Sequence, residues 1–462
     1  MHVRGFVSGV LALVLVLLAV PATAGAEDGW WAFTGTVYDE GTGDPLPYAY
    51  VSLKKQVEGV DPEIYAAVTD QDGRFHIPPY FIGAGEWRFI YNVDCYVVVS
   101  RTGWDYAKSP ARRWVGSMID LGRFELERDP AVVPHQVIFG QDRFETAGLI
   151  SEAMFPQGLD ESPEVVTTGA VVIASGVSWP DALVAASVAG VEDAPVLLTD
   201  FYGYGGGWGY YSDYNMIAEL RQLKPDRAII VGGDDVVSAD VEREVNVWVG
   251  ADDVVRLAGD TRFETARAVA AYIADHVPAV SRTALVASGY SFADALSASP
   301  VAWSEQFPLY LVRRDGIDQA TIDAMVADGV TDVMLLGGTA AVPASVEESL
   351  VAQFGGANVA RTGGANRYET AALVADWGVS EFGFDFANPA IVSGQDFPDA
   401  LSGGPYQGRT GSVLLLTKRD RLEPIVATAL TDHEAEIEEV RFFGGPAAVS
   451  TAVRREVDLL LR

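Results

Sequence analysis

Short runs of consecutive apolar residues recur along the C-terminal two thirds of the chain, with segments of helical spacing between them. The runs form three matching sets, at 171–174, 284–287 and 390–392, at 195–199, 308–312 and 413–417, and at 228–231, 333–336 and 440–443. Because these runs do not alternate with polar residues, they predict strands that are covered on both faces. Segments such as 262–273 and 320–327 carry the spacing of helices. The strand–helix–strand order predicts an α/β fold with a parallel sheet in each set.

The N-terminal part of the chain has a different pattern. Residues 34–38 and 49–53 alternate between apolar and polar positions, and turn residues occupy 41–45 and 69–73. Short alternating strands with turns every 8–12 residues or so are typical of antiparallel sandwiches. We therefore expect an antiparallel β-sandwich over 30–128 and a linker over 129–137.

Three ordered motifs occur three times in the C-terminal part. An Arg-Phe/Tyr-Glu-Thr-Ala pentad begins at Arg143, Arg262 and Arg367, and a Ser-Gly…Asp-Ala-Leu block and a Gly-Gly pair follow it in each copy. The Asp of the second motif recurs after 113 and 105 residues. Solenoid repeats have periods of roughly 20–50 residues, so each copy is long enough to be a small domain. We assign repeat 1 to 138–250, repeat 2 to 251–355 and repeat 3 to 356–462.

The first 26 residues read as a secretory signal peptide. Arg4 precedes a wholly apolar run over 10–20, and small residues at 22–26 offer a cleavage site. The apolar run is short for a membrane span of ~20 residues, so we expect cleavage and no membrane span afterwards. The single cysteine, Cys95, excludes a disulfide within the chain and is expected to be a buried thiol.

The chain is strongly acidic, with 64 acidic and 32 basic residues and a net charge of −32. Residues 129–462 hold 48 of the acidic and 21 of the basic residues, a net charge of −27. Binding of nucleic acid is disfavoured, because affinity for phosphates comes from clustered Lys and Arg.

The pentad arginines are candidate ligand-binding residues. Arg143, Arg262 and Arg367 are the only cations placed alike in all three copies. Each guanidinium could clamp a phosphate or carboxylate of a polymer, or it could form an internal ion pair with the Asp of the Asp-Ala-Leu block. The pattern leaves both interpretations open. The pentad glutamates are expected in the first turn of a helix.

The second motif follows a predicted strand and opens a predicted helix. Its Gly permits a sharp exit from the sheet, and its Asp is expected to cap or to occupy the first helical turn. Capping alone would account for the Asp. The candidate residues of this motif are Ser175, Gly176, Asp181, Ser288, Gly289, Asp294, Ser393, Gly394 and Asp399.

The third motif ends a predicted strand and precedes helix start signals at Ser238, Pro343 and Ser450. A Gly-rich turn before a helix N-terminus can bind an anion through backbone N–H groups. In parallel sheets such loops gather at the carboxyl edge, where ligands usually bind. The candidate residues of this motif are Gly232, Gly233, Gly337, Gly338, Gly444 and Gly445.

Enzyme chemistry has little support in the sequence. None of the five histidines recurs among the repeats, and no nucleophile-elbow motif accompanies them. We expect no catalytic residue, no metal site and no cofactor. A carboxylate pair for glycan hydrolysis remains open, because 64 acidic residues offer many candidates.

Taken together, the three motifs and the Pro-Val-Leu-Leu-Thr run at 195–199 resemble the cell wall binding repeat 2 family over about 138–462. The resemblance implies non-covalent anchoring of a secreted protein to an anionic polymer of a Gram-positive-type wall. It also implies three α/β subdomains about a pseudo-threefold axis. A wall hydrolase, such as an amidase, and a structural or adhesive surface-layer component are the alternatives. The net charge of −27 opposes an anionic ligand unless arginine clusters, salt or divalent cations intervene.

The N-terminal segment resembles the carboxypeptidase regulatory-like domain, a transthyretin-like β-sandwich. The matching residues include Gly43-x-Pro45, Thr69-Asp70-x-Asp72-Gly73 and Gly85-x-Trp87. The resemblance implies a non-catalytic spacer or adhesive module. Asp70 and Asp72 could bind calcium, but a turn in which they cap their own backbone is favoured.

Repeat 1 carries an aromatic, glycine-rich insertion over 201–215 that repeats 2 and 3 lack. A platform on which sugars stack and a flexible insertion are the two interpretations, and the second is favoured.

Overall fold

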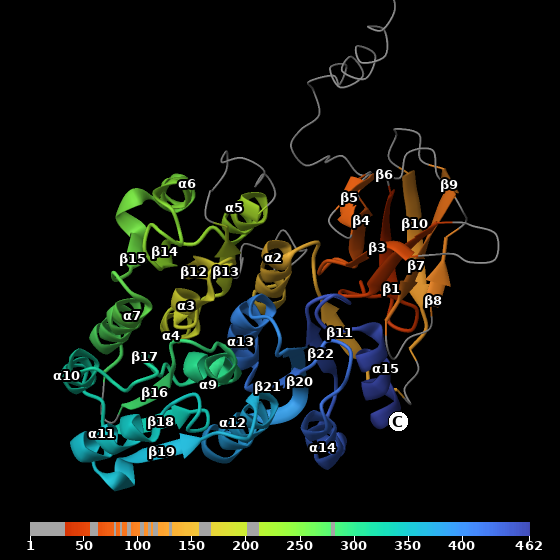
Figure 1. Cartoon of the computed structure of the whole chain (residues 1–462). Helices are drawn as coiled ribbons and strands as arrows, with labels where there is room; N and C mark the ends of the chain where they lie inside the picture. Colours follow the sequence, from red (N-terminus) through yellow and green to blue (C-terminus); the bar gives the residue numbers. More distant parts are fainter. Residues whose placement is uncertain are drawn as a thin grey trace, which may run out of the picture.

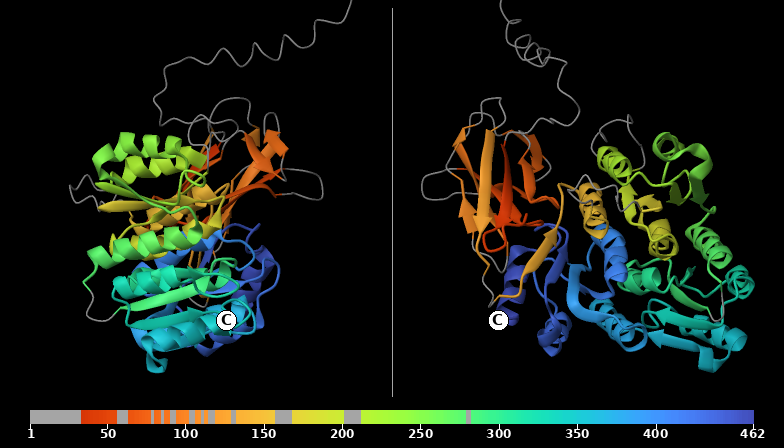
Figure 2. Two further views of the ribbon diagram at one scale, coloured as in Figure 1. Left: turned by 60° about the vertical axis from the view of Figure 1, so that its left-hand side comes forward. Right: turned by 180° about the vertical axis from the view of Figure 1, so that it is seen from behind.

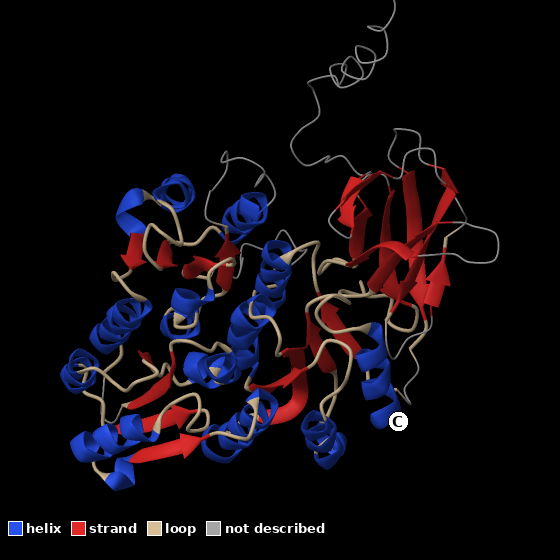
Figure 3. Ribbon diagram, in the orientation of Figure 1, coloured by secondary structure: helices blue, strands red, loops and turns tan. Residues whose placement is uncertain are grey.

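The computed structural model describes residues 33–55, 63–77, 80–83, 86–89, 94–101, 106–109, 112–113, 119–128, 132–156, 168–200, 212–278 and 282–462. A β-sandwich and a larger α/β body make up this part of the chain (Figures 1 and 3). The signal peptide expected over 1–26 and most of the 201–215 insertion lie outside the described residues.

The sandwich contains a three-stranded and a five-stranded sheet and a hairpin. The first sheet has the order β10–β1–β4, the second has the order β3–β2–β7–β8 with β9 beside β7, and β5 pairs with β6. The strands are β1 (Phe33–Asp39), β2 (Tyr50–Lys55), β3 (Glu63–Val68), β4 (Arg74–Ile77), β5 (Tyr80–Gly83), β6 (Glu86–Phe89), β7 (Asp94–Ser100), β8 (Tyr106–Lys108), β9 (Arg112–Arg113) and β10 (Ile119–Leu126). Among these described strands, every pairing is antiparallel except the parallel one between β1 and β10.

The sandwich has a core of its own, formed by the inward-facing residues of both sheets. Val51, Val97 and Phe75 are buried in it, and Cys95 is a buried free thiol as expected. Asp70 accepts hydrogen bonds from the backbone N–H groups of Asp72 and Arg74 at 3.0 and 2.8 Å. The expected turn interpretation of Asp70 is therefore confirmed.

The α/β body contains three parallel four-stranded sheets, which we call sheets 1, 2 and 3. Sheet 1 has the order β13 (Val196–Thr199), β12 (Ala170–Ser175), β14 (Arg227–Val231), β15 (Val254–Leu257). Sheet 2 has the order β17 (Leu309–Val312), β16 (Thr283–Ser288), β18 (Asp332–Leu336), β19 (Val359–Thr362). Sheet 3 has the order β21 (Ser412–Thr417), β20 (Asp385–Ser393), β22 (Val440–Phe443), β11 (His135–Ile138). The predicted α/β class with parallel sheets is confirmed.

The fourth strand of each sheet comes from the segment that introduces the next repeat. β15 and β19 complete sheets 1 and 2, yet each leads directly into the pentad helix of the following repeat. Sheet 3 is completed by β11, which precedes repeat 1 and pairs with β22 through His135 opposite Val440. The chain therefore closes a ring, because a strand before the first repeat belongs to the last sheet.

Helices cover the sheets and fill the centre of the ring. They are α2 (Arg143–Met154), α3 (Trp179–Ala182), α4 (Ala185–Val191), α5 (Ser212–Leu223), α6 (Ala239–Val249), α7 (Arg262–His276), α8 (Ala293–Ser297), α9 (Ser299–Ser304), α10 (Gln319–Ala327), α11 (Ala344–Phe354), α12 (Arg367–Phe382), α13 (Pro398–Thr410), α14 (Pro424–Asp432) and α15 (Thr451–Leu460). Short 3₁₀ turns occupy 251–253, 356–358 and 434–436.

The three helices α4, α9 and α13, one from each repeat, pack against one another at the centre of the body (Figure 1). Glycines permit this close approach. A Cβ at Gly190 would lie 1.9 Å from the carbonyl oxygen of Trp303, and one at Gly408 would lie 2.5 Å from that of Pro300. Larger residues at these positions would push the repeats apart, so the axis depends on small residues.

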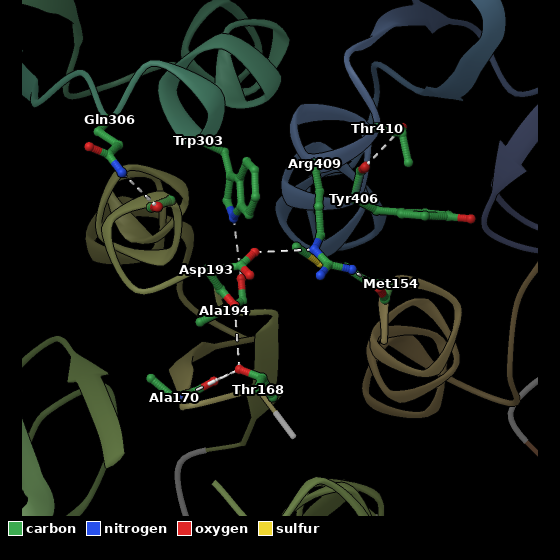
Figure 4. A network of polar contacts seen from close by, with 11 residues as sticks. Met154, Thr168, Ala170, Asp193, Ala194, Trp303, Gln306, Tyr406, Arg409 and Thr410 are labelled. Carbon is green, nitrogen blue, oxygen red and sulfur yellow. Dashed lines mark hydrogen bonds and ion pairs between the residues drawn. The ribbon is translucent and has the colours of Figure 1, made fainter. Parts of the chain in front are cut away.

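Polar contacts join the three repeats where the central helices end (Figure 4). The Trp303 Nε1 donates to the carbonyl of Ala194 at 3.3 Å, and Gln306 Nε2 donates to the carbonyl of Gly190 at 3.2 Å. Arg409 pairs with Asp193 at 3.1 Å. Repeats 2 and 3 are thus both bound to the end of α4 in repeat 1.

The sandwich packs directly on the body, beside β11 and α15 (Figure 2). Tyr48 belongs to the core of the repeats, and the Tyr50 ring lies 5.8 Å from the ring of Phe139. Arg101 forms an ion pair with Glu439 of repeat 3. The two parts therefore share one continuous apolar contact.

Three carboxyl groups are buried where the sandwich meets repeat 1. They are Asp70 in the turn before β4, Glu152 on α2 and Glu219 on α5. Burial raises the pKa of Asp70 to about 6 and the pKa of Glu152 to about 7, and it raises the pKa of Glu219 well above its ordinary value. The negative charge of Glu152 raises the pKa of Glu219 further.

Candidate functional site

Each pentad helix begins with a capping box. Asp142 and Asn366 accept backbone N–H groups of the first turn at 2.9–3.1 Å, and Thr261 does so at 3.4 Å. The pentad glutamates stand three residues later, where Glu264 accepts a hydrogen bond from Thr261 at 3.1 Å. This arrangement explains why the helix starts at the pentad arginine and confirms that the glutamates occupy the first turn.

The pentad arginines hold the loop of the second motif in their own repeat. Nη1 of Arg143, Arg262 and Arg367 donates to the carbonyls of Gly176, Gly289 and Gly394 at 2.6, 2.7 and 2.5 Å. This contact positions each guanidinium at the carboxyl end of a sheet. All three arginines remain half-buried.

Each of these guanidinium groups also lies over an aromatic ring of the neighbouring repeat. Arg143 lies 5.7 Å from the ring centre of Phe397, Arg262 lies 5.4 Å from that of Trp179, and Arg367 lies 5.4 Å from that of Phe292. The pairing runs from repeat 1 to 3, from 2 to 1 and from 3 to 2. The arginines therefore link the ring of repeats by cation–π contacts.

The three aromatic rings meet one another at the axis. The Trp179 and Phe292 rings are 6.0 Å apart, and the Phe292 and Phe397 rings are 6.1 Å apart. These residues precede the Asp-Ala-Leu blocks: Trp179 begins α3, and Phe292 and Phe397 directly precede α8 and α13. Sequence analysis missed them, although their common position two residues before each Asp is visible in the three copies.

The aspartates of the second motif lie in the first turns of α3, α8 and α13, as expected. Burial raises the pKa of Asp181 and of Asp294, and raises that of Asp399 to about 6. Arg262 and Arg367, each from the following repeat, act in the opposite direction on Asp181 and Asp294. The charge of an arginine from the following repeat therefore stabilises the ionised form of Asp181 and of Asp294.

The serines and glycines of the second motif are buried and shape the loop. Ser175 accepts the N–H of Val177 at 3.2 Å, and Ser288 and Ser393 accept the equivalent N–H groups of Tyr290 and Gln395 at 3.2 Å. A Cβ at Gly176 would lie 2.7 Å from the ring of Phe144, so the pentad ring requires a glycine there. Their positions do not support the prediction that these serines and glycines face a ligand, because all six residues are buried.

The first glycine of each Gly-Gly pair is buried against the aspartate of its own repeat. Gly232, Gly337 and Gly444 have φ angles of 116°, 101° and 96°, a region that favours glycine. A Cβ at Gly444 would lie 2.2 Å from Oδ2 of Asp399. These glycines are structural, and only Gly233, Gly338 and Gly445 are partly exposed.

The anion cradle expected at the Gly-Gly loops stays a prediction, because only part of the backbone N–H groups there have partners within the protein. In repeat 1 the N–H groups of Val236 and Val237 both donate to the carbonyl of Gly233 at 3.0 Å, and the other two repeats repeat this pattern. These two N–H groups of each loop are thus used within the turn. Arginines outside the three motifs complete the loops: Arg256, Arg361 and Arg454 donate to the carbonyls of Gly232, Gly337 and Gly444 at 2.8, 2.8 and 2.9 Å.

The loops of the three second motifs therefore surround one end of the axis. We call this surface the threefold face and define it by the half-buried arginines Arg143, Arg262 and Arg367 and by the residues that follow each Ser-Gly, Val177, Tyr290 and Gln395. Val177 and Tyr290 are 60% and 41% exposed, and Gln395 is exposed. Among the described residues, no pentad arginine lies within ion-pair distance of an Asp-Ala-Leu aspartate, and Arg143 pairs instead with Asp396 at 3.7 Å. The interpretation as a clamp on a polymer stays a prediction.

The sequence matches the family described as cell wall binding domain 2 (CWB2) at residues 137–242, 256–347 and 361–454. The chain belongs to this family. The second and third matches begin within β15 and just after the start of β19, so the sequence unit opens at the strand that completes the preceding sheet. Three tandem copies are confirmed, and the family supports association with a cell wall.

Two curated relatives from Bacillus subtilis (strain 168) are similar to most of this CWB2 chain. N-acetylmuramoyl-L-alanine amidase LytC is 26% identical over 321 residues, which cover 69% of this chain and 57% of the relative. The protein named amidase enhancer is 24% identical over 344 residues, which cover 74% of this chain and 42% of the relative. The chain thus spans about half the length of these relatives.

Two solved structures from Clostridium difficile share the fold. Cwp6 has a TM-score of 0.61 at 19% identity and is matched over 90% of this chain and 63% of its own. Cwp8 has a TM-score of 0.60 at 19% identity and is matched over 80% of this chain and 59% of its own. Within the described ranges, no cluster of His, Cys, Asp and Glu has the arrangement of a metal site. A helix able to cross a bilayer is likewise absent from the part of the chain that the structure describes.

Proposed function

We propose that this protein is secreted and binds an anionic polymer of the cell wall without covalent attachment, through the threefold face. The observation that carries the proposal is the convergence of three matching loops, each with a half-buried arginine, at one end of the axis. The CWB2 family membership supports a wall polymer as the ligand.

A polymer with repeating units suits a face with repeating sites. Once one loop engages a unit, the neighbouring loops meet the next units at a high effective concentration, so three weak contacts add up to stable attachment. The rigid ring favours this effect, because the loops need no further ordering when the polymer binds.

The β-sandwich would then be a spacer or adhesive module of the carboxypeptidase regulatory-like type. Tyr48 and Arg101 of the sandwich contact the repeats, and the rest of the sandwich extends beyond the ring (Figure 2). We infer no catalytic role for either part of the chain.

Sedimentation of the full chain with purified walls tests the proposal. Val177→Glu with Tyr290→Glu places two negative charges on the threefold face and removes no internal ion pair. Val326→Glu with Leu459→Glu is the matched control, because these apolar residues are 49% and 62% exposed elsewhere. We expect the first double variant to bind at least tenfold more weakly and the control to bind like the wild type. Equal binding by all three proteins would rule out the threefold face as the binding surface.

A wall hydrolase is the second candidate, because one similar protein is named an amidase and another an amidase enhancer. Clearing of a wall suspension by the purified chain would favour this candidate. Assembly of the chain into sheets without any wall would instead favour a structural surface layer.

A further inference from the structure

The residues that follow the second strand of each repeat occupy equivalent positions beside the threefold face. The carbonyls of Thr199, Val312 and Thr417 accept the N–H groups of the Ser-Gly glycines at 2.9, 2.9 and 2.8 Å. The next residues, Asp200, Arg313 and Lys418, are therefore structural counterparts. This correspondence follows from strand register and needs no sequence alignment.

The charge at this position is inverted in repeat 1. Asp200 stands where repeats 2 and 3 carry Arg313 and Lys418, and the next residues in those repeats are the exposed Arg314 and Arg419. Repeats 2 and 3 thus each hold a pair of adjacent cations at the carboxyl edge of the sheet. The chain has a net charge of −32, so two pairs of adjacent cations on one face are a local concentration of positive charge in an acidic protein.

The first cation of each pair is held in place. Arg313 lies 4.3 Å from the ring centre of Phe263, and Lys418 lies 5.4 Å from that of Tyr368, so both stand over the aromatic residue of the pentad. Lys418 also pairs with Glu423 at 2.8 Å. These cations position the loop more than they offer charge to a ligand.

The second cation of each pair is available. Among the described residues, no carboxylate lies within ion-pair distance of the guanidinium of Arg314 or Arg419. The Arg419 backbone is fixed, since its N–H donates to Gln395 and its carbonyl accepts from Ser450, at 2.9 and 2.8 Å. The Arg419 loop is therefore tied to the threefold face through Gln395, while its side chain remains exposed.

Tyr290 connects the cation pair of repeat 2 to its pentad arginine. Its ring centre lies 4.9 Å from Arg314 and 5.8 Å from Arg262, so one exposed ring is close to two guanidinium groups. A sugar ring stacks on such an aromatic surface, and an acidic substituent would meet the guanidinium groups. This combination fits an acidic sugar polymer better than a neutral one.

We propose that Arg314 and Arg419 hold the anionic groups of a polyanionic sugar chain, so that repeats 2 and 3 supply the charge contacts and repeat 1 does not. The inference rests on the proposed function and specifies which residues of the face contact the charged groups of the polymer. The overall negative charge of the protein does not prevent this contact, because salt limits repulsion to about 8 Å at physiological ionic strength.

Binding of soluble polymers to the full chain tests the inference. The probes are polygalacturonate for carboxylate groups, poly(glycerol phosphate) for phosphate groups and dextran as an uncharged chain. We expect wild-type protein to bind at least one charged probe and not dextran. Arg314→Glu with Arg419→Glu should weaken that binding at least tenfold. Asp200→Asn removes the carboxylate of repeat 1 and should tighten binding at least twofold.

The control carries the same change in net charge elsewhere. Arg243→Glu with Arg455→Glu reverses two exposed arginines on α6 and α15, and we expect binding within twofold of the wild type. Equal losses in both double variants would overturn the inference, as would unchanged binding by Asp200→Asn. If walls sediment the protein but neither charged polymer binds, attachment to the wall through the threefold face stands, and the anionic character of the ligand, which both proposals assume, is refuted.

Discussion

Gly190 is the position where the packing of the three repeats can be tested most directly. It lies in α4 at the axis, and a Cβ there would stand 1.9 Å from the carbonyl oxygen of Trp303. Real Cβ atoms essentially never approach within 3.0 Å of another heavy atom, so Gly190→Ala requires a shift of about 1 Å or more. The obstructing atom belongs to the backbone, and side-chain rotation cannot relieve the contact.

Two effects of opposite sign determine the outcome. Alanine is a better helix former than glycine, which stabilises the variant by at most about 1 kcal/mol. Overpacking costs roughly 1–3 kcal/mol, and disturbing the inter-repeat hydrogen bonds of Trp303 and Gln306 adds about 1 kcal/mol for each. The losses exceed the gain, so we expect a net destabilisation of about 3 kcal/mol and a fall in melting temperature of about 5 °C.

Thermal unfolding followed by circular dichroism measures this change. Gly169→Ala is the control, because no heavy atom lies within 4 Å of its Cβ position and its φ angle is not in the left-handed region. We expect the control to melt within about 1 °C of the wild type or slightly above it. If Gly190→Ala were as stable as the control, the repeats would not be packed as closely at the axis as we describe.

Two further predictions concern the junction and the loops. Because Asp70, Glu152 and Glu219 have raised pKa values in the folded protein, the folded state binds more protons than the unfolded one, and stability should fall as the pH rises from about 4.5 to 7. Glu219→Gln should flatten this profile and raise the melting temperature at pH 7; a variant with the wild-type profile would show that the Glu219 carboxyl group does not contribute to the pH dependence. Arg361→Met removes hydrogen bonds to the carbonyls of Gly337 and Val342 and an ion pair with Glu347, so it should cost about 2 kcal/mol in urea unfolding, whereas the exposed Arg455→Met should change stability by less than about 0.5 kcal/mol.

Local patterns predicted the central strands of the three sheets well. The runs at 171–174, 284–287 and 390–392 all lie within observed strands, and every residue of these runs is buried. Helices cover such strands on both faces, so a run of consecutive apolar residues is enough to indicate that the strand is buried. The helix starts at Ser238 and Ser450 were also predicted, since a side-chain cap is a local interaction.

The fourth strand of each sheet was not predicted. β15, β19 and β11 lie at sheet edges, and the first two are only partly buried, so they lack a continuous apolar run. The sheet that each of these strands joins is determined by contacts between segments that are far apart in the sequence. Nothing in the four residues of β11 indicates that they pair with Val440–Phe443, about three hundred residues away.

For the candidate residues too, the sequence predicted local features better than it predicted the role of each residue. The three motifs were correctly recognised as belonging together, yet most of their serines, aspartates and first glycines are buried supports. The aromatic cluster of Trp179, Phe292 and Phe397 and the exposed cations Arg314 and Arg419 became apparent only from their positions around the axis.

By itself, the sequence determined the α/β class, the three copies and the local starts of strands and helices, because these depend on interactions between residues that are near one another in the chain. Only the tertiary structure decided that the copies close into a ring, that each arginine meets the ring of a neighbouring repeat, and which charged residues share one face. Those features depend on contacts between distant segments, where strand register and the close approach at Gly190 select the arrangement.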